Sequence, residues 1–363
     1  MTRYGQKLSF AFISIALTLT VLPASAKTIA TLKAAVIDST QVTTNSTPSP
    51  LERKDVNAFI DHMVKKFQFS RKKLRTAFAK VHLRPRIIKT IHNPKEATPW
   101  FKYKHIFLTT KRIDAGVVFW QKHEGKLAQA EKKYGVPAHI ILGILGVETF
   151  YGTRAGTHSA LDALATLAFN YPERSKFFTS ELEALFLLSR EQHFDPLVLK
   201  SSYAGALGYP QFMPSSYRDY AIDFSSDGVA DLLGNPEDAI GSVANYLSKK
   251  GGWRSSQPIA ERAKLTHEVL LPNEKTKNIA TLEQLAKKGI VPTRSIAKST
   301  KARAFQIQEK DELQTWLGFN NFKAILRYNP RINYAMAVMN LGEAIQNAKQ
   351  KKARENHATI SKT

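Results

Sequence analysis

Residues 137–152 read Pro137-Ala-His-Ile-Ile-Leu-Gly-Ile-Leu-Gly-Val-Glu-Thr-Phe-Tyr-Gly152. Proline is favourable in the first turn of a helix, and the residues after it are apolar on nearly every side. A helix that is apolar all round is a buried one, so this stretch predicts the central helix of a mainly helical core. The predicted helix ends at Glu148.

Glu148 is the first candidate for chemistry. Burial disfavours a carboxylate, and the negative end of a helix disfavours it again, so both effects raise the expected pKa of Glu148. A carboxyl group that keeps its proton near neutral pH can act as the general acid of a glycosidase. The alternative is a structural buried glutamate with a backbone or arginine partner, and the residues alone leave both interpretations open.

Helical periodicity extends on both sides of this stretch. Residues 51–114 predict an N-terminal helical segment, with Ser70 as a cap and an irregular region at 85–113. Residues 115–253 predict the core, with further helices near 177–191 and 237–249. One face of the first predicted helix is apolar: Val56, Phe59, Ile60, Met63 and Val64.

The C-terminal third has a different texture. Residues 254–333 are basic and contain short alternating runs at 267–271 and 304–308, which predict a small mixed, β-containing subdomain. Residues 334–350 predict a helix that returns to the core, and residues 351–363 a disordered tail. The predicted fold class is therefore α+β, mostly α.

The N-terminus reads as an export signal over residues 1–26, with cations at Arg3 and Lys7, an apolar run, and Ala24-Ser-Ala26 as a cleavage site. A membrane anchor is the alternative, although the apolar run is short for one. Residues 27–50 are rich in Thr, Ser and Pro and predict a linker. The chain has no cysteine, which excludes disulfides and attachment of a lipid to cysteine.

The net charge is +23, from 53 basic and 30 acidic residues. Such a chain is attracted to polyanions. Export argues against nucleic acid as the partner and favours cell-wall polymers or anionic lipid head groups. The alternative is a surface whose charge serves only solubility.

A loop rich in glycine and proline covers residues 201–217. Its glycines allow a ligand to approach the backbone, Ser202 and Gln211 offer hydrogen bonds, and its aromatic side chains offer faces for sugar rings. A tight loop packed against the core is the alternative.

Residues 223–231, Asp-Phe-Ser-Ser-Asp-Gly-Val-Ala-Asp, match the first half of a calcium loop. Oxygen ligands alternate, and Gly228 stands at the sharp turn. Gly234 replaces the glutamate expected at position twelve, so Glu237 or Asp238 would have to close the site. An ordinary acidic turn is the alternative.

Six blocks together resemble the membrane-bound lytic transglycosylase B family of murein-cleaving enzymes (glycoside hydrolase family 103). The resemblance covers roughly residues 51–350. The blocks are 146–149, 161–167, 169–172, 208–217, 238–246 and 327–338.

The resemblance implies a lysozyme-like, mostly helical fold in which Glu148 is the catalytic residue. The sugar-binding residues that it implies are Ser202, Gln211, Tyr246, Arg174, Tyr328, Asn329 and Tyr103. It also implies a structural calcium ion, with ligands from Asp223, Ser225, Asp227, the carbonyl of Val229, and Asp238.

This chain departs from the family pattern in three places. The loop after Asp227 is longer by one residue, which leaves the last calcium ligand open, and Glu173 stands where a second arginine is familiar. The family's lipidation cysteine is absent, which implies a soluble form.

The reaction implied is cleavage of the β-1,4 bond between N-acetylmuramic acid and N-acetylglucosamine, without net use of water, leaving a 1,6-anhydro end. No cofactor is required for this chemistry. We expect a periplasmic monomer that acts on peptidoglycan strands, with other cell-wall enzymes as a further class of partner and no role for nucleic acid. A lysozyme-type hydrolase, a non-catalytic wall-binding protein and a polyanion-binding structural protein are the competing hypotheses.

Overall fold

The computed structural model describes residues 49–92, 98–269, 271 and 279–360 of the 363-residue chain. The predicted export signal and nearly all of the predicted linker lie outside the described residues. The chain divides into two compact units, with the boundary between Lys80 and Val81. Within the described ranges, no helix combines the length and apolar character needed to cross a membrane.

The described part of the smaller unit is a pair of helices, α1 (Lys54–Phe67) and α2 (Arg71–Phe78), after a short 3-10 turn, η1 (Pro50–Glu52). Ser70 caps α2 as predicted, because its Oγ accepts a hydrogen bond from the Lys73 N–H at 3.4 Å. The predicted apolar face of α1 is buried at Val56, Phe59, Ile60 and Met63.

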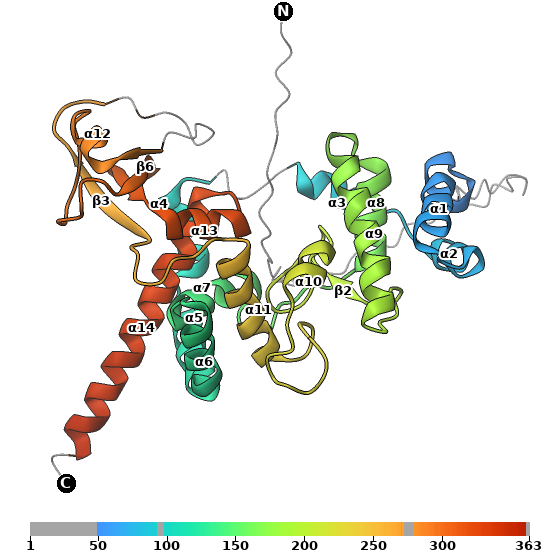
Figure 1. The fold of residues 1–363 in the computed structure, drawn as a ribbon, viewed down its shortest axis with the longest axis horizontal. Coiled ribbons are helices and arrows are strands. Elements are labelled where there is room, and N and C mark those ends of the chain that lie inside the picture. The colour runs from blue at the N-terminus through green and yellow to red at the C-terminus, as the bar shows by residue number, and fades with distance from the viewer. Residues whose placement is uncertain (1–48, 93–97, 270, 272–278, 361–363) are drawn as a thin grey trace, which may run out of the picture. The chain divides into compact units, whose positions relative to one another are not determined.

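The larger unit is mostly helical, which confirms the predicted fold class (Figure 1). The predicted helices near 177–191 and 237–249 are present as α9 (Ser175–Glu191) and α11 (Pro236–Lys249). The helices are α3 (Pro85–Ile91), α4 (Trp100–Phe107), α5 (Thr110–Lys122), α6 (Glu124–Tyr134), α7 (Ala138–Thr149), α8 (Ala160–Asn170), η3 (Pro172–Arg174), α9 (Ser175–Glu191), α10 (Pro214–Tyr220), α11 (Pro236–Lys249), α12 (Leu282–Ala286), α13 (Asn320–Tyr328) and α14 (Ile332–Ile360).

The prediction of an irregular region at 85–113 is wrong, because α3, α4 and the start of α5 lie there. Pro85 occupies the first turn of α3, and Pro99 is the N-cap of α4. Proline lacks an N–H that would have no partner in the first turn of a helix, so these prolines begin helices instead of interrupting them.

The helix α7 occupies the centre of the larger unit, and every residue in it except His139 is buried, as predicted. The helix α14 packs directly against it. A Cβ on Gly143 would lie 2.3 Å from the Val338 carbonyl oxygen, and one on Gly342 would lie 2.4 Å from the His139 carbonyl oxygen. These two glycines therefore allow the two helix backbones to approach closely.

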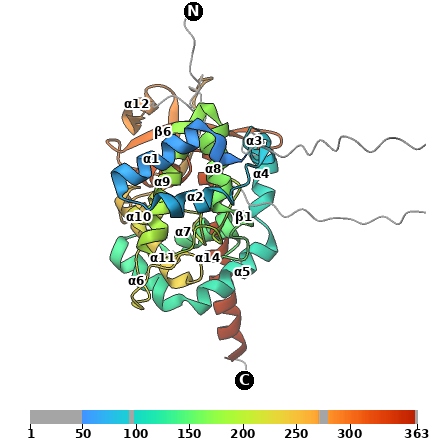
Figure 2. The same ribbon diagram turned by 90° about the vertical axis from the view of Figure 1, so that its right-hand side faces the viewer.

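The helix α14 continues to Ile360, where the sequence predicted a disordered tail from residue 351. Residues 351–355 (Lys-Lys-Ala-Arg-Glu) favour helices, and Lys351 pairs with Glu355 one turn later at 3.8 Å. Two residues before Lys351, Lys349 pairs with Glu124 at the start of α6 at 2.8 Å. The C-terminal part then extends past α5 and α6 (Figures 1 and 2).

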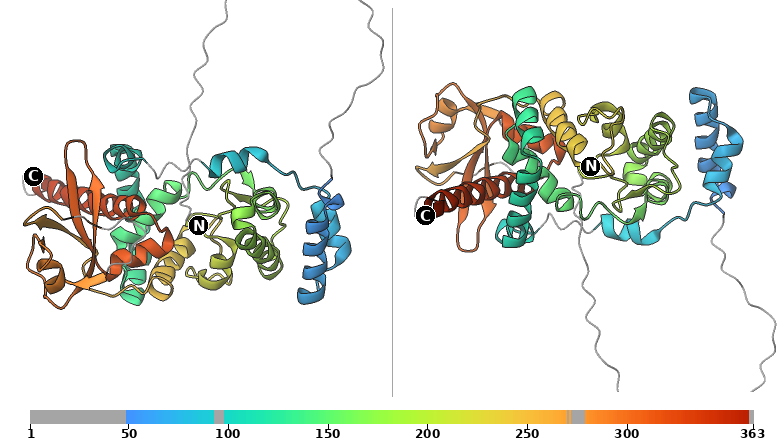
Figure 3. Two further views of the ribbon diagram at one scale, coloured as in Figure 1. Left: turned by 90° about the horizontal axis from the view of Figure 1, so that it is seen from above. Right: turned by 90° about the horizontal axis from the view of Figure 1, so that it is seen from below.

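The β-containing segment forms a five-stranded antiparallel sheet in the order β4-β6-β7-β3-β5, at the opposite end of the larger unit from α8 and α9 (Figure 3). Side chains of β6 alternate between two cores. Ala302 and Ala304 face the cluster that includes α12, and Phe305 and Ile307 join the main core. The strands are β3 (Ala260–Leu265), β4 (Ile279–Thr281), β5 (Ile290–Pro292), β6 (Lys301–Gln308) and β7 (Leu313–Gly318).

Two short strands, β1 (His158–Ser159) and β2 (Lys200–Ser201), pair with each other in the helical part of this unit. The alternating run predicted at 304–308 lies in β6. The run at 267–271 follows the end of β3, so it lies outside the strands of the described residues.

The α7–α14 contact predicts a large penalty for Gly143→Ala. The added methyl group would overlap backbone rather than a flexible side chain, so we expect a loss of about 1–3 kcal/mol in the free energy of unfolding. The matched control is Gly125→Ala in α6, where a Cβ would meet nothing within 4 Å. Urea denaturation should show the first variant destabilised and the second no less stable than the parent. Equal stability of the two variants would contradict the close packing.

Candidate active site

Glu148 lies near the C-terminal end of α7 and is only 2% exposed. The phenol of Tyr334, in the first turn of α14, donates a hydrogen bond of 2.6 Å to its Oε1. The two residues are 186 positions apart in the sequence, and the close contact of α7 with α14 brings them together. The structure therefore holds this carboxyl group in a defined orientation inside the core.

Tyr328, Tyr246 and Tyr103 form a tyrosine group with Tyr334. The Tyr334 ring stacks on Tyr328 with centroids 6.4 Å apart and an interplanar angle of 13°. Tyr328 in turn meets the edge of Tyr246 at 4.9 Å. Tyr103 of α4 is fully buried and close enough to Tyr334 to influence its ionisation.

Burial, and next the neighbouring Glu148, raises the pKa of Tyr334 and of Tyr328 well above the ordinary value. Both side chains therefore remain phenols across the physiological pH range. A phenol that keeps its proton is a hydrogen-bond donor to the carboxyl group beside it.

The chain makes a tight turn directly after Thr149, the last residue of α7. Phe150 and Tyr151 both adopt left-handed backbone conformations, with φ of 52° and 58°. Non-glycine residues rarely occupy that region, and consecutive examples store strain of the kind found at functional sites. The Thr149 hydroxyl holds the turn, since it donates to the Tyr209 carbonyl at 2.8 Å and accepts from the Gly152 N–H at 2.9 Å.

The bond from Thr149 to Tyr209 brings the glycine-rich loop to this end of α7. In that loop Gln211 has a left-handed backbone, with φ of 51°, and its Nε2 donates to the carbonyls of Ala155 and Gly208 at 3.1 and 2.9 Å. Its Oε1 is buried and has no hydrogen-bond partner among the described residues.

Ser202 lies at the start of the same loop and forms hydrogen bonds within it. Its hydroxyl accepts from the Ala206 N–H at 3.1 Å, and its N–H donates to the Ala206 carbonyl at 2.9 Å. The hydroxyl proton remains available as a donor to a ligand.

Asn329 follows Tyr328 directly and is 2% exposed. Neither its amide nitrogen nor its amide oxygen has a hydrogen-bond partner among the described residues. A buried amide without partners costs folding free energy, on the order of 1–3 kcal/mol for each polar group. An arrangement of this kind is typical of a site that binds a polar ligand.

Two further predicted residues differ in placement. Tyr246 belongs to the tyrosine group, and its phenol donates to the Arg327 carbonyl at 2.8 Å. Arg174 lies in η3, where its guanidinium group covers the Phe177 ring at 4.1 Å from the centroid. Burial lowers the pKa of Arg174, with Tyr171 and Glu181 acting in the opposite direction.

The predicted metal residues also gather in space. Oxygen atoms of Asp223, Asp227 and Asp238 lie within 4.8 Å of one another. The Asp238 carboxylate is fully buried and accepts from the N–H groups of Phe224, Ser225 and Asp231 at 2.8–2.9 Å. The other predicted ligands lie in the same loop: the Ser225 hydroxyl donates to Asp223 at 3.2 Å, and the Val229 carbonyl accepts from Asp231 at 3.1 Å.

The donors in this acidic loop are hard oxygen atoms, which suit calcium. Three carboxylates at this separation repel one another, and a divalent cation would remove that repulsion. The chemistry of the donor set therefore fits the ion that the sequence predicts.

Tyr334 and Thr149 are the two site residues that the sequence reasoning did not select. A buried tyrosine usually finds a hydrogen-bond partner, so Tyr334 could have been marked as needing one. Nothing in the sequence indicates that the partner is Glu148.

Comparison with known proteins gives a consistent result. A family model described as the transglycosylase SLT domain matches residues 52–343. Membrane-bound lytic murein transglycosylase B of Escherichia coli is 41% identical over 297 residues, covering 79% of this chain and 81% of its own.

Solved structures agree with the sequence matches. The lytic transglycosylase SltB1 of Pseudomonas aeruginosa superposes with a TM-score of 0.77 at 40% identity, covering 82% of this chain and 98% of its own. Slt35 of Escherichia coli, solved in complex with calcium, superposes with a TM-score of 0.76 at 41% identity, covering 82% of this chain and 94% of its own. SltB3 of Pseudomonas aeruginosa, solved in complex with NAG-NAM-pentapeptide, superposes with a TM-score of 0.69 at 27% identity, covering 80% of this chain and 78% of its own.

Proposed function

Because the chain belongs to the transglycosylase SLT domain family and is a lytic transglycosylase of peptidoglycan, we propose that Glu148 is its catalytic acid and base. The observation that carries this assignment is the bond of 2.6 Å from the Tyr334 phenol to a carboxyl group that is otherwise enclosed by the core. The bond orients the carboxyl group that exchanges the proton with the substrate.

The reaction requires one carboxyl group that acts twice. Protonated Glu148 donates its proton to the oxygen of the β-1,4 bond between N-acetylmuramic acid and N-acetylglucosamine, and that bond breaks. The acetamido carbonyl of the substrate stabilises C1, as in other substrate-assisted glycosidases. The Glu148 carboxylate then takes the proton from the C6 hydroxyl, whose oxygen attacks C1 and closes the 1,6-anhydro ring.

The proposed glycan cleft lies along the tyrosine group and the glycine-rich loop. The buried amides of Gln211 and Asn329 retain polar atoms that a sugar hydroxyl or acetamido group can satisfy. Tyr246 and Tyr328 offer aromatic surface beside them, and Ser202 offers its hydroxyl proton. Arg174 and Tyr103 complete the proposed binding residues from η3 and α4.

Calcium is the proposed structural ion of the acidic loop. Asp223, Asp227 and Asp238 would hold it by carboxylates, with the Ser225 hydroxyl and the Val229 carbonyl as further donors. The bound ion would neutralise the three carboxylates and stabilise the loop without taking part in the reaction.

The biological setting follows from the substrate. We place the protein in the periplasm as a monomer that binds peptidoglycan strands, with an N-terminal helical pair, a lysozyme-like core and a small sheet subdomain. Calcium is structural in this scheme, and the chemistry requires no cofactor.

Glu148→Gln should lower the rate of murein cleavage by several orders of magnitude, because the amide can neither donate nor accept the proton. The fold should be preserved, since glutamine has the same shape as glutamate. The assay is mass spectrometry of products from digested murein. A 1,6-anhydro product from the parent supports the transglycosylase, and a hydrated product would indicate a lysozyme-type hydrolase. Glu181→Gln is the matched control, since Glu181 is also a buried glutamate but bonds to Ser215. More than about a tenth of the activity in Glu148→Gln would exclude the acid–base role.

Tyr334→Phe should lower the cleavage rate by roughly tenfold and move the pH profile. The phenol favours the charged form of Glu148, so removing it raises the Glu148 pKa. Activity that requires protonated Glu148 is lost as the pH rises through that pKa, so the basic limb should move to higher pH. Tyr151→Phe, which removes a buried bond to the Arg112 carbonyl, should leave the limb in place. An unmoved limb in Tyr334→Phe would assign Tyr334 a purely structural role.

Calcium should raise the melting temperature, since an ion that binds only the folded state stabilises by about 2.7 kcal/mol at a hundredfold excess over Kd. Asp227→Asn should remove most of that gain. Asp231→Asn should retain it, because Asp231 bonds to the Leu233 and Gly234 N–H groups instead. Identical melting curves with chelator and with calcium would exclude the metal site.

A further inference from the structure

A cavity lies at the opposite end of α7 from Glu148. Its volume is about 400 Å³, within the range of roughly 300–1,000 Å³ that is typical of small-molecule sites. His139 lines it and precedes Glu148 by nine residues, which corresponds to roughly 13 Å along the helix axis. The cavity is therefore separate from the catalytic cleft.

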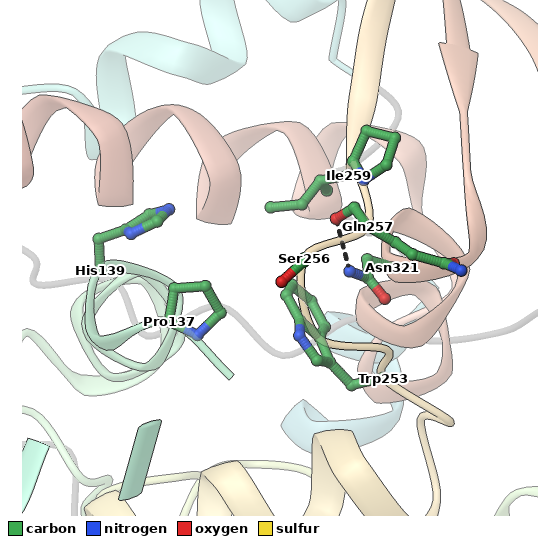
Figure 4. A pocket seen from close by; sticks show the side chains of 8 residues that line it. Pro137, His139, Trp253, Ser256, Gln257, Ile259 and Asn321 are labelled. Atoms are coloured by element: carbon green, nitrogen blue, oxygen red, sulfur yellow. Dashed lines mark hydrogen bonds between the residues drawn. The ribbon is translucent and has the colours of Figure 1, made fainter. Parts of the chain in front are cut away.

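Figure 4 shows how the two walls of this cavity face each other. Pro137 and His139, at the start of α7, form one wall. Trp253, Ser256 and Ile259 form the other, with the Ser256 hydroxyl and the Ile259 side chain pointing toward the first wall. The walls are mostly apolar rings and aliphatic groups, with a few polar atoms between them.

The second wall is rigid. The Asn321 amide donates to the carbonyls of Arg254 and Gln257 at 2.8 and 2.9 Å and accepts from the Arg254 N–H at 2.9 Å. Within this clamp Ser256 keeps a left-handed backbone, with φ of 60°. Such a conformation costs on the order of 1 kcal/mol for a non-glycine residue, and the clamp maintains it.

Trp253 contributes a polar atom without a partner. The residue is 8% exposed, and its indole Nε1 has no hydrogen-bond partner among the described residues. Figure 4 shows this nitrogen on the side of the ring that faces Pro137 across the cavity. A buried indole N–H usually has an acceptor, so a ligand carbonyl or hydroxyl would satisfy it.

The cavity is electrically neutral. The eight described residues that line it include no carboxylate, lysine or arginine. Burial lowers the pKa of His139, against the smaller opposing effect of Glu131, so the imidazole is neutral and one ring nitrogen can accept a hydrogen bond. The Glu131 carboxylate already binds the Ala138 N–H at 3.0 Å, which disfavours an anionic ligand at this helix start.

We propose that this cavity is an accessory site for an N-acetylglucosamine residue of the glycan, distinct from the cleft at Glu148. N-acetylglucosamine is uncharged, whereas N-acetylmuramic acid carries a lactyl carboxyl group or a stem peptide. Its ring carbons and acetyl methyl group match the proline, indole and isoleucine surfaces. Its acetamido carbonyl accepts from Trp253, and its hydroxyls bond with Ser256 and His139. The choice of ligand rests on the proposed function, since it takes the glycan as the molecule at hand.

An N-acetylglucosamine residue bound in this cavity would attach the glycan strand to the enzyme at a second site. A strand bound at both sites gains effective concentration at the catalytic cleft without any new contact at the reacting bond. Short glycans that cannot span both sites gain nothing.

The indole N–H groups of the protein provide a direct test. The chain has four tryptophans, so an NMR spectrum of ¹⁵N-labelled Glu148→Gln protein contains four indole signals, and Trp253→Phe identifies the signal of Trp253. Titration with N-acetylglucosamine should shift that signal saturably. His139→Leu and Ser256→Gly, whose new glycine accommodates the left-handed backbone, should each weaken binding by about tenfold. Ser255→Ala, beside the cavity, is the matched control and should bind as the parent does.

Each outcome is decisive. The proposal would be overturned if the Trp253 signal does not move. It would also be overturned if His139→Leu and Ser256→Gly bind N-acetylglucosamine as tightly as the control Ser255→Ala. An equal response to N-acetylmuramic acid would overturn the selectivity for an uncharged sugar. Because the titration does not depend on cleavage, its failure leaves the role of Glu148 intact, and loss of that role leaves the titration valid.

Discussion

The contact between α7 and α14 is the constraint on which the rest of the structure depends. Gly143 and Gly342 let the two backbones meet at distances that a methyl group would prevent, and this separation allows the Tyr334 phenol to reach Glu148. The same contact closes the main core, because α7 is buried on nearly every side. Stability and the proposed catalytic role of Glu148 therefore both depend on this packing, and a change that separates the helices should affect both.

Energetically unfavourable features gather at one end of this helix pair. At the C-terminal end of α7 the structure accumulates costly features: consecutive left-handed residues after Thr149, a buried amide oxygen on Gln211, and a buried amide on Asn329. Each opposes folding, and the Gln211 oxygen and the Asn329 amide have no hydrogen-bond partner among the described residues. A ligand that supplies the missing hydrogen bonds would offset these costs, which is why we place the proposed glycan cleft here.

The sequence predicted well what depends on local pattern and poorly what depends on distant contact. The apolar run before Glu148 predicted a buried helix with an acidic end, and that prediction is confirmed. The sequence did not place helices at Pro85 and Pro99, because proline is found at the start of a helix as well as at a break, and only the chain that follows distinguishes the two. Tyr334 could not be linked to Glu148, because helical periodicity carries no information on which residue of a distant helix it will meet.

Hydrogen bonds connect the acidic loop to the glycine-rich loop that contains Gln211. The Tyr217 phenol donates to the Ala230 carbonyl at 2.7 Å and accepts from the Leu232 N–H at 2.9 Å. These two bonds fix the C-terminal part of the acidic loop to α10. The Leu232 carbonyl then accepts from the Tyr209 N–H at 2.9 Å, two residues before Gln211. An ion bound by the three carboxylates would therefore restrain the loop that positions Gln211, while making no contact with the reacting bond. Calcium would act on the rate through order in the glycan cleft, and its effect should fall on glycan binding more than on the proton transfer at Glu148.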